Sequence, residues 1–128
     1  MSIMLDTRIA ILVRDGDDVV MARVERVETQ ILLPVIVRVE LEGGLMRDPD
    51  NAAIRRRRLD AMVAAFATVA FDEPCAQAYG RIVAAAGYSR RKLLDRMIAA
   101  QALVHQVALA TRNPQDFADV PGLGLEVW

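Results

Sequence analysis

Short apolar runs alternate with longer stretches of mixed polarity along the whole chain. Runs of this length are typical of buried strands. The pattern predicts five strands, at Ile3–Asp6, Ile31–Leu33, Thr68–Phe71, Ala108–Thr111 and Leu125–Trp128. Continuous apolar character favours parallel strands that are covered on both faces.

The stretches between these runs have the apolar periodicity of helices. They are expected to be helical over Ile9–Val13, Val19–Val27, Val35–Leu45, Asn51–Phe66, residues 73–86 and Leu93–His105. Gly16, with the aspartates on either side, favours a turn, after which Asp17 or Asp18 could cap the second helix. Asp72 stands where an N-cap is expected, and Gly87 where a helix stops.

Helices between short apolar strands predict an α/β fold. We expect three layers, with a central, mostly parallel sheet of about five short strands flanked by helices. The 128 residues are enough for one core, so residues 1–128 are predicted to form a single domain.

Composition points to the cytoplasm. No apolar run reaches the ~18 residues that span a bilayer, and the run from Ile31 to Val39 is interrupted by Pro34 and Arg38. The N-terminus lacks the basic and long apolar regions of a signal peptide. The single cysteine, Cys75, cannot form an internal disulfide. We therefore expect a cytoplasmic protein without a membrane partner.

The sequence lacks the residues that several other classes of site require. The only histidine, His105, excludes a two-histidine zinc site within one chain. Ser2 and Ser89 are the only serines, and no motif joins Ser89 to His105 as a nucleophile and base. The net charge of −1 is too small for the whole chain to bind polyanions unspecifically.

Four acids are the main candidate for chemistry. Asp6 ends the first apolar run, Glu40 lies in an apolar helix, Asp95 lies in the first turn of another, and Asp116 follows the Ala108–Thr111 strand. A carboxylate in an apolar stretch is costly unless it is paired or binds a cation. Ligands of open α/β sheets bind beyond the carboxyl ends of the strands. We therefore expect these four carboxyl groups to converge there, around a hard metal ion.

Four motifs in order resemble those of a known family. They are Leu5-Asp6-Thr7, Glu40-Leu41-Glu42-Gly43-Gly44, Asp95-Arg96-Met97-Ile98-Ala99-Ala100 and Thr111-Arg112-Asn113-Pro114-Gln115-Asp116-Phe117. Together with the tail Gly122–Trp128, they are similar to the PIN-domain ribonucleases, specifically the VapC toxins of toxin–antitoxin pairs. The resemblance covers essentially the whole chain. It implies a PIN-like fold and Mg²⁺- or Mn²⁺-dependent endonucleolytic cleavage of RNA.

Each acid has an expected role in that chemistry. A cation held by carboxylates activates water and relieves charge on a phosphate. Asp6 with Asp95 or Asp116 are the expected direct ligands, because Mg²⁺ usually takes one or two carboxylates and several waters. Glu40 could bind the metal through water or orient the nucleophile. Asp119 is a less favoured fourth acid.

Substrate contacts are expected around the acids. The polar motif residues Thr7, Thr111 and Asn113 are predicted to contact RNA. A basic cluster precedes Asp95 and should lie at the rim of the acidic pocket; its members are Arg90, Arg91 and Lys92. A second basic run, Arg55–Arg58, points all round its helix and is interpreted as a solvated surface or as ion-pair partners of Asp50 and Asp60.

One residue departs from the family pattern. Arg8 stands where the family usually has Asn, beside the first acid. Its guanidinium could compete with the metal, hold a substrate phosphate, or turn to solvent without effect. The first case gives an alternative function, a catalytically silent PIN-like interaction module. A phosphoacceptor receiver domain is disfavoured, because the only lysine, Lys92, does not end the last strand.

The resemblance also implies partners: a homodimer, and a VapB-type antitoxin whose tail lies in a groove between helices. Apolar residues that could serve both contacts are Ile9, Ile11, Leu12 and Val13 near the site, and Val35, Val39, Met62 and Phe66 further along. An amphipathic segment of the antitoxin would bury its apolar side there.

Overall fold

Five parallel strands form one sheet at the centre of the protein. The computed structural model describes residues 2–128. The strands are β1 (Ile3–Leu5), β2 (Ile31–Pro34), β3 (Ala67–Val69), β4 (Ala108–Thr111) and β5 (Leu125–Val127). Their order across the sheet is β3-β2-β1-β4-β5, and every neighbouring pair is parallel. The predicted fold class is therefore confirmed.

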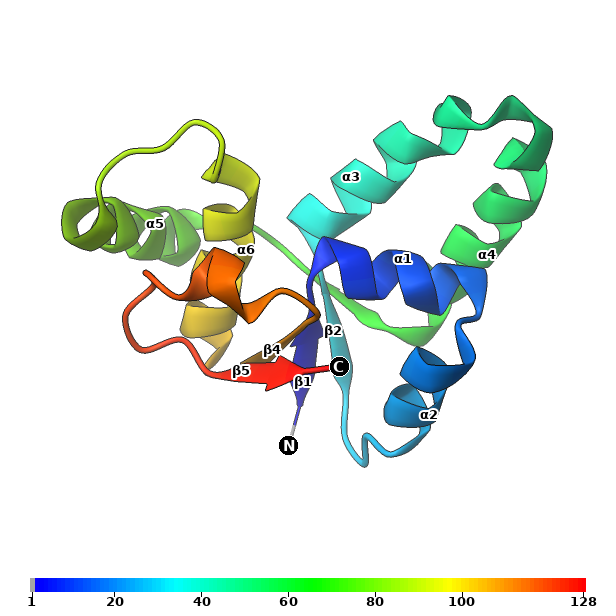
Figure 1. Ribbon diagram of the computed structural model, residues 1–128, viewed down its shortest axis with the longest axis horizontal. Coiled ribbons are helices and arrows are strands. Elements are labelled where there is room, and N and C mark those ends of the chain that lie inside the picture. Colours follow the sequence, from blue (N-terminus) through cyan, green and yellow to red (C-terminus); the bar gives the residue numbers. More distant parts are fainter. Residues whose placement is uncertain (1) are drawn as a thin grey trace.

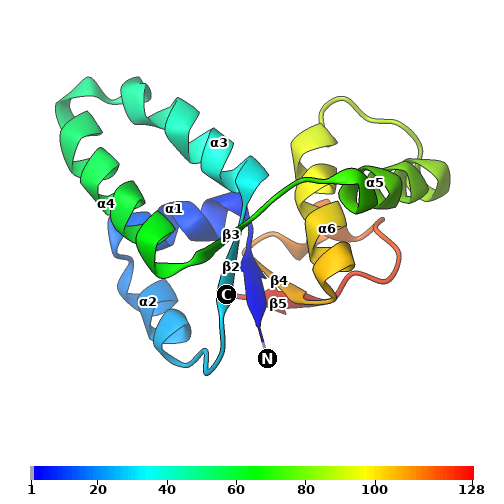
Figure 2. The same cartoon turned by 180° about the vertical axis from the view of Figure 1, so that it is seen from behind.

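Six α-helices cover the sheet from two sides. They are α1 (Thr7–Asp15), α2 (Asp18–Glu25), α3 (Val35–Gly44), α4 (Ala52–Ala65), α5 (Glu73–Ala86) and α6 (Leu93–His105). Figure 1 shows α1 to α4 on one side of strands β1 and β2, with α5 and α6 on the other side. The same division is seen from behind in Figure 2. The layers agree with the three-layer expectation.

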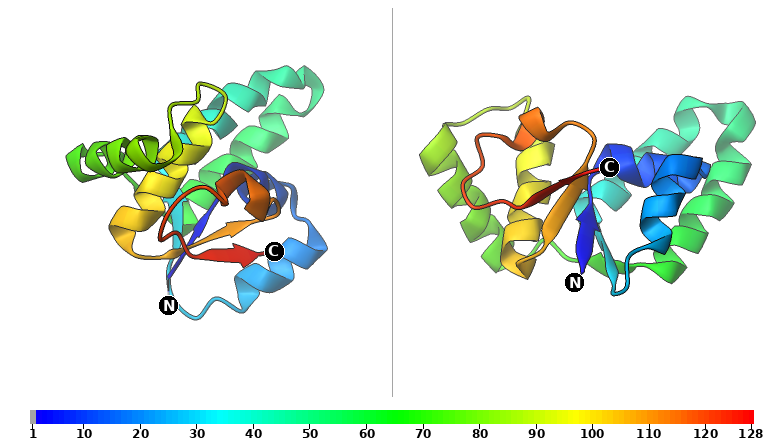
Figure 3. Two further views of the ribbon diagram at one scale, coloured as in Figure 1. Left: turned by 60° about the vertical axis from the view of Figure 1, so that its left-hand side comes forward. Right: turned by 60° about the horizontal axis from the view of Figure 1, so that its bottom comes forward.

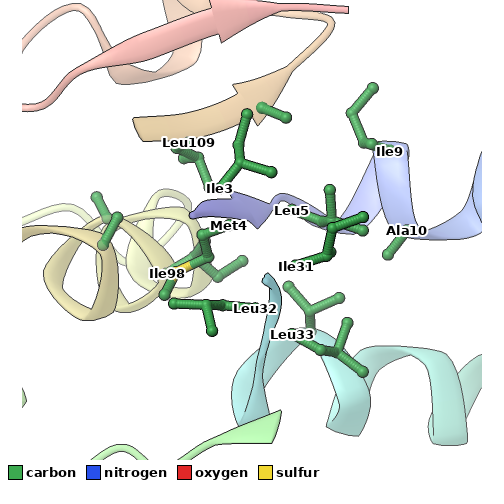
Figure 4. Close-up of a cluster of buried hydrophobic side chains, with 14 of the residues drawn as sticks. Ile3, Met4, Leu5, Ile9, Ala10, Ile31, Leu32, Leu33, Ile98 and Leu109 are labelled. Carbon is green, nitrogen blue, oxygen red and sulfur yellow. The ribbon is translucent and has the colours of Figure 1, made fainter. Parts of the chain in front are cut away.

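The core lies on both faces of the first two strands. Met4, Leu5 and Leu33 are completely buried, as the apolar runs require. In Figure 4, Met4 lies near Ile98 of α6, whereas Leu5 lies on the side of α1. Successive strand residues point to opposite faces, so these short runs must be apolar at every position.

Aspartates begin three of the helices. Asp6, Asp17 and Asp72 each accept a hydrogen bond from a backbone N–H of the first turn, at 2.9, 3.0 and 3.3 Å. Of the two candidates for capping α2, the structure selects Asp17. Gly16 ends α1 with a positive φ of 75°, a conformation that glycine adopts without steric cost.

Three short 3₁₀ helices were not predicted. They are η1 (Leu45–Arg47), η2 (Pro49–Asn51) and η3 (Pro114–Phe117). The first two carry the chain from α3 into α4, and a proline opens η2 and η3. Figure 3 shows β5 beside β4 in both views, after the loop that follows η3. Over residues 2–128, no helix combines the length and apolar character needed to cross a membrane.

Candidate functional site

The four candidate acids come from four elements that meet at one end of the sheet. Asp6 directly follows β1, Glu40 lies in α3, Asp95 lies in the first turn of α6, and Asp116 lies in η3 after β4. Because all strands are parallel, their carboxyl ends share one edge. Figure 1 shows α1, α3 and α6 beginning close to this edge.

Asp6 is the most enclosed of the four acids. Its residue is 7% exposed, and its side chain accepts a hydrogen bond of 2.9 Å from the Ile9 N–H. Burial raises the pKa of Asp6 and the charge of Asp116 adds to that rise, whereas Thr111 and the N–H groups of Ile9 and Arg8 oppose it. The net direction is upward, because burial disfavours the charged form of this carboxyl group.

Thr111 supports Asp6 from the neighbouring strand. Its side chain is buried, and its hydroxyl oxygen accepts a hydrogen bond of 3.1 Å from the Asn113 N–H. The proton of the hydroxyl thus remains available for Asp6, in keeping with the lowering effect of Thr111 on the pKa of that carboxyl. Asn113 itself is exposed.

Asp95 experiences all three of the other acids. Burial raises the pKa of Asp95 to about 6, and the charges of Asp116, Glu40 and Asp6 add to the rise. Lys92 acts in the opposite direction with the smallest effect. Like charges at close range disfavour ionisation. The four carboxylates therefore share one electrostatic field, as the sequence predicted.

Glu40 is held by the residue that follows Asp6. The Thr7 hydroxyl donates a hydrogen bond of 2.7 Å to Glu40 Oε1. This contact joins the start of α1 to the middle of α3. It leaves the second carboxylate oxygen of Glu40 without a hydrogen bond from any group of residues 2–128. Thr7, predicted to bind substrate, is thus also a support for Glu40.

The acids do not form a closed set of ligands. Among the described residues, no three His, Cys, Asp or Glu side chains lie close enough together to hold a metal ion. The other three acids therefore act on Asp95 through their charge, and the expected convergence around one metal ion stays a prediction. The donor chemistry still fits a hard divalent cation, because Mg²⁺ needs only one or two carboxylates and completes its shell with water.

The predicted basic rim is divided between two roles. Arg90 and Arg91 are exposed, whereas Lys92 Nζ lies 3.0 Å from Asp119 Oδ2. Arg96 Nη2 lies 3.0 Å from the same Asp119 oxygen, and Arg96 is only 3% exposed. These two cations hold the pKa of Asp119 below its usual value. The less favoured fourth acid is thus an ion-pair partner between α6 and the loop after η3.

Arg8 is exposed on the surface of α1. Within residues 2–128 its guanidinium forms no ion pair with any acid, whereas its backbone N–H favours the charged form of Asp6. Of the three roles considered for Arg8, this placement agrees with a side chain that turns to solvent.

The second basic run also has partners. Arg56 bonds to Glu42 and to Asp60, which joins α3 to α4. Arg55 Nη2 lies 3.6 Å from Asp48, not from the expected Asp50. The Asp60 pairing is confirmed and the Asp50 pairing is wrong, because η2 begins after Asp48 and carries Asp50 away.

Sequence reasoning missed a pocket beside the acids. It has a volume of about 430 Å³, and its lining combines Thr7 and Glu40 with three arginines, Arg14, Arg47 and Arg55. These arginines are distant in sequence and come together only because α3, η1 and α4 fold back over α1. Of the three arginines, only Arg55 belongs to a basic run of the sequence, and that run indicates a solvated surface or ion-pair partners.

Comparisons with known proteins add to this geometry. A family model described as PIN domain matches residues 3–123. No curated protein matches the chain.

Solved structures share the whole fold. A chain of VapBC2 from Rickettsia felis, crystallised on a DNA fragment from its promoter, has 24% identity and a TM-score of 0.87, over 100% of this chain and 99% of that one. DNA-bound VapBC from Salmonella typhimurium has 20% identity and a TM-score of 0.85, over 100% of this chain and 98% of that one. FitAcB from Neisseria gonorrhoeae has 25% identity and a TM-score of 0.83, over 96% of this chain and 95% of that one.

Proposed function

The chain belongs to the PIN domain family, and from this membership we propose that it is the VapC-type toxin of a type II toxin–antitoxin pair. Its activity is then endonucleolytic hydrolysis of RNA in the cytoplasm, with Mg²⁺ or Mn²⁺ as cofactor. The whole chain, residues 1–128, acts as one domain. The supporting comparison is the likeness to chains of VapBC complexes over nearly their full length.

One observation carries the nuclease proposal. Asp6, Glu40, Asp95 and Asp116 reach one end of the sheet from four separate elements, and burial, with the charges of the other three acids, raises the pKa of Asp95 to about 6. Such an arrangement costs stability in the absence of a cation. Perturbed acids of this kind are typical of functional sites.

The acids have distinct roles in this proposal. Asp6 with Asp95 or Asp116 would hold the cation, which when bound would acidify water and draw charge from the phosphate. Glu40, oriented by Thr7, accepts a proton from the attacking water through its second oxygen. Asp6 is kept in position by the Ile9 N–H and by Thr111.

Substrate contacts surround these acids. Thr7 bonds to Glu40, Thr111 to Asp6, and the Asn113 N–H to Thr111, so a hydroxyl or amide of this group could bond to the ribose-phosphate chain. Arg90 and Arg91 are exposed and would offer charge to flanking phosphates, whereas Lys92 is paired with Asp119. Phosphate contacts position a nucleic acid without reading its sequence.

The exposed position of Arg8 argues against a silent interaction module. That alternative requires the Arg8 guanidinium to occupy the metal site, and Arg8 is exposed without an ion pair to any acid of residues 2–128. We propose no separate function on that basis.

The partner of this chain is proposed to be a VapB-type antitoxin, with RNA as substrate and a second copy of the chain in a homodimer. The likeness to the VapBC structures from Rickettsia felis and Salmonella typhimurium supports such a partner. The dimer predicts a mass in light scattering of twice the 14.1 kDa of one chain. A strictly monomeric chain at high concentration would contradict the dimer and leave the nuclease proposal standing.

Cleavage assays test the nuclease proposal. The purified chain should cut single-stranded or loop RNA with Mg²⁺ or Mn²⁺ and stop in EDTA. Asp6→Asn and Asp95→Asn should each lose most cleavage, because each deletes a charge that the cation needs. Glu28→Gln, an exposed acid between α2 and β2, is the matched control and should cut normally. Full activity in both aspartate variants would refute the assignment.

A further inference from the structure

The pocket beside the acids has a lining of mixed charge. It lies between α1, α3, η1, α4 and the start of α6, and measures about 430 Å³. Its polar lining includes Thr7, Glu40, Arg14, Arg47 and Arg55, and Leu94 lines it from the start of α6. Thr7 follows Asp6 and Leu94 precedes Asp95 in the chain, so the pocket adjoins the proposed catalytic acids.

Acid and base occupy different ends of this pocket. Arg14 is seven residues beyond Thr7 in α1, and Arg47 is seven residues beyond Glu40, past the end of α3. At a rise of 1.5 Å per residue, Arg14 is attached about 10 Å along α1 from Thr7, and Arg47 lies in η1, beyond the last residue of α3. One end therefore carries the Glu40 carboxylate, and the other carries arginines.

The arginines retain charge for a ligand. Arg47 is exposed and makes no ion pair within the described part of the chain. Arg55 Nη2 lies 3.6 Å from Asp48 Oδ2, so the two form a long ion pair without a hydrogen bond. Arg14 is 7% exposed and bonds to Asp15 through Nε and Nη2, so its Nη1 is left unused by Asp15. A guanidinium presents more donors than one carboxylate can take.

Two glycines form part of the pocket wall without a packing reason. A Cβ at Gly43 or Gly44 would meet no atom within 4 Å, and Gly44 has ordinary helical angles, φ −79° and ψ −16°. Glycine in a helix costs about 1 kcal/mol relative to alanine. At these positions, therefore, neither packing nor backbone geometry requires glycine, and the missing side chains leave the pocket wider.

We propose that this pocket binds a phosphate of the RNA backbone next to the one that is cut, through Arg47 and Arg55 with Arg14 at the base. Arginine suits this task because its planar fork bonds two phosphate oxygens at once. The volume exceeds that of a phosphate alone and accommodates part of the attached nucleotide. Glu40 repels a phosphate from its own end, which places the ligand toward the arginines. This inference rests on the proposed function, since it assigns a substrate contact to that site.

Binding without cleavage is the direct test. A labelled single-stranded RNA is titrated into Asp95→Asn protein in EDTA, over a range of salt concentrations. Arg47→Ala in that background should weaken binding roughly threefold to tenfold for every RNA sequence. The slope of log K against log salt should fall by about 0.7 for one lost phosphate contact on single-stranded RNA. The double change Arg47→Ala with Arg55→Ala should lower both further.

Two further variants separate binding from folding. Arg57→Ala is the matched control, since Arg57 is an exposed arginine of α4 outside the pocket lining; it should leave affinity and slope unchanged. Gly44→Leu fills the pocket while improving helix propensity, so RNA affinity should fall as resistance to urea rises. A simple loss of fold would lower both.

The outcomes distinguish this inference from the proposed function. Equal affinity and equal salt slope for Arg47→Ala and Arg57→Ala overturn the phosphate site, even if the wild-type chain cuts RNA. Arginine-dependent binding by a wild-type chain that never cuts RNA would support the site and overturn the nuclease. Absence of any RNA binding overturns both.

Discussion

The hydroxyl of Thr7 donates a hydrogen bond of 2.7 Å to the carboxylate of Glu40, across 33 positions of sequence. Thr7 is the first residue of α1, and Asp6 before it caps that helix. The contact therefore ties Glu40 to the same short segment that positions Asp6. This hydrogen bond therefore fixes the position of the Glu40 carboxylate relative to the start of α1.

Removal of the Thr7 hydroxyl should slow cleavage more than it weakens substrate binding. Thr7→Val keeps the shape of the side chain and deletes the donor, which leaves Glu40 free to rotate. For a part-buried hydrogen bond we expect a loss of about 1 kcal/mol, roughly fivefold in kcat. Thr7→Ser retains the hydroxyl and should behave nearly as wild type. Equal rates for the Val and Ser variants would show that Glu40 needs no such support.

Asp95→Asn should stabilise the metal-free protein at neutral pH. The pKa of Asp95 is about 6 in the folded chain, against a usual 3.8. The folded state therefore binds this proton more tightly than the unfolded state, and stability falls as pH rises from about 4 to about 6. Asparagine abolishes that penalty. Because the residue is partly exposed, the gain is limited to the region of 1 kcal/mol.

Urea unfolding in EDTA at pH 4 and pH 7 measures this effect. The difference in unfolding free energy between Asp95→Asn and wild type should be small at pH 4, where both side chains are neutral in the folded protein. It should grow by pH 7. Mg²⁺ should reverse the order by stabilising only the wild type, since binding to the folded state adds stability. A stability difference independent of pH would show that Asp95 is not strained by its neighbours.

The predictable part of this fold is its local periodicity. The bounds expected for α6 and β4, Leu93–His105 and Ala108–Thr111, are those observed, because continuous apolar runs and helical spacing leave little choice there. The expected strand at Thr68–Phe71 lies at Ala67–Val69 instead. Register with β2 decides those bounds, through Leu32 opposite Ala67, and local sequence does not contain that information.

Three of the four acids were candidates because they end or interrupt an apolar element, namely Asp6, Glu40 and Asp95. The roles of the arginines around them were not predictable, because an arginine in a polar stretch is normally solvated and gives no signal of a special contact. Arg96 is the clearest case. It lies next to Asp95 in α6, yet it is 3% exposed and binds Asp119 and the Gly87 carbonyl oxygen. Only the path of the loop after η3 reveals that role.

Asp119→Asn should destabilise the protein and weaken activity indirectly. The change leaves the buried Arg96 guanidinium without its anion, which costs about 1–3 kcal/mol. The same loop carries Asp116 three residues earlier, so its release should also lower cleavage. Glu28→Gln serves as the control, since it removes an exposed charge that has no ion-pair partner among residues 2–128.

The Asp119 contribution should also depend on pH. Lys92 and Arg96 hold the pKa of Asp119 below its usual value of 3.8. Its stabilising effect is therefore present above that usual value and lost as pH falls below it, toward the folded pKa. Unfolding free energies of wild type and Asp119→Asn should converge in strong acid. A constant difference down to pH 2 would rule out the ion pairs as the source of the effect.

Ala65→Glu should prevent binding of the proposed antitoxin without lowering RNA cleavage by the free chain. An apolar groove of about 330 Å³ lies between α1, α2 and α4, and Val13, Met62 and Phe66 from the predicted apolar set line it. Ile9 from that set is completely buried and cannot serve a partner. Ala65 is exposed on the groove, so Ala65→Glu places a charge where an amphipathic segment of the antitoxin would bury its apolar side.

The neighbouring residue supplies the control for that experiment. Ala64 is also exposed on the last turn of α4 but lies outside the groove lining, so Ala64→Glu has the same cost at the helix end. Each variant is co-purified with a VapB-type protein encoded beside its gene, and RNA cleavage is measured with and without that protein. Ala65→Glu should cut RNA normally and resist inhibition, whereas Ala64→Glu should be inhibited like wild type. Equal inhibition of both variants would place the antitoxin on another face of the chain, because a buried, unpaired carboxylate in the groove would cost several kcal/mol of binding.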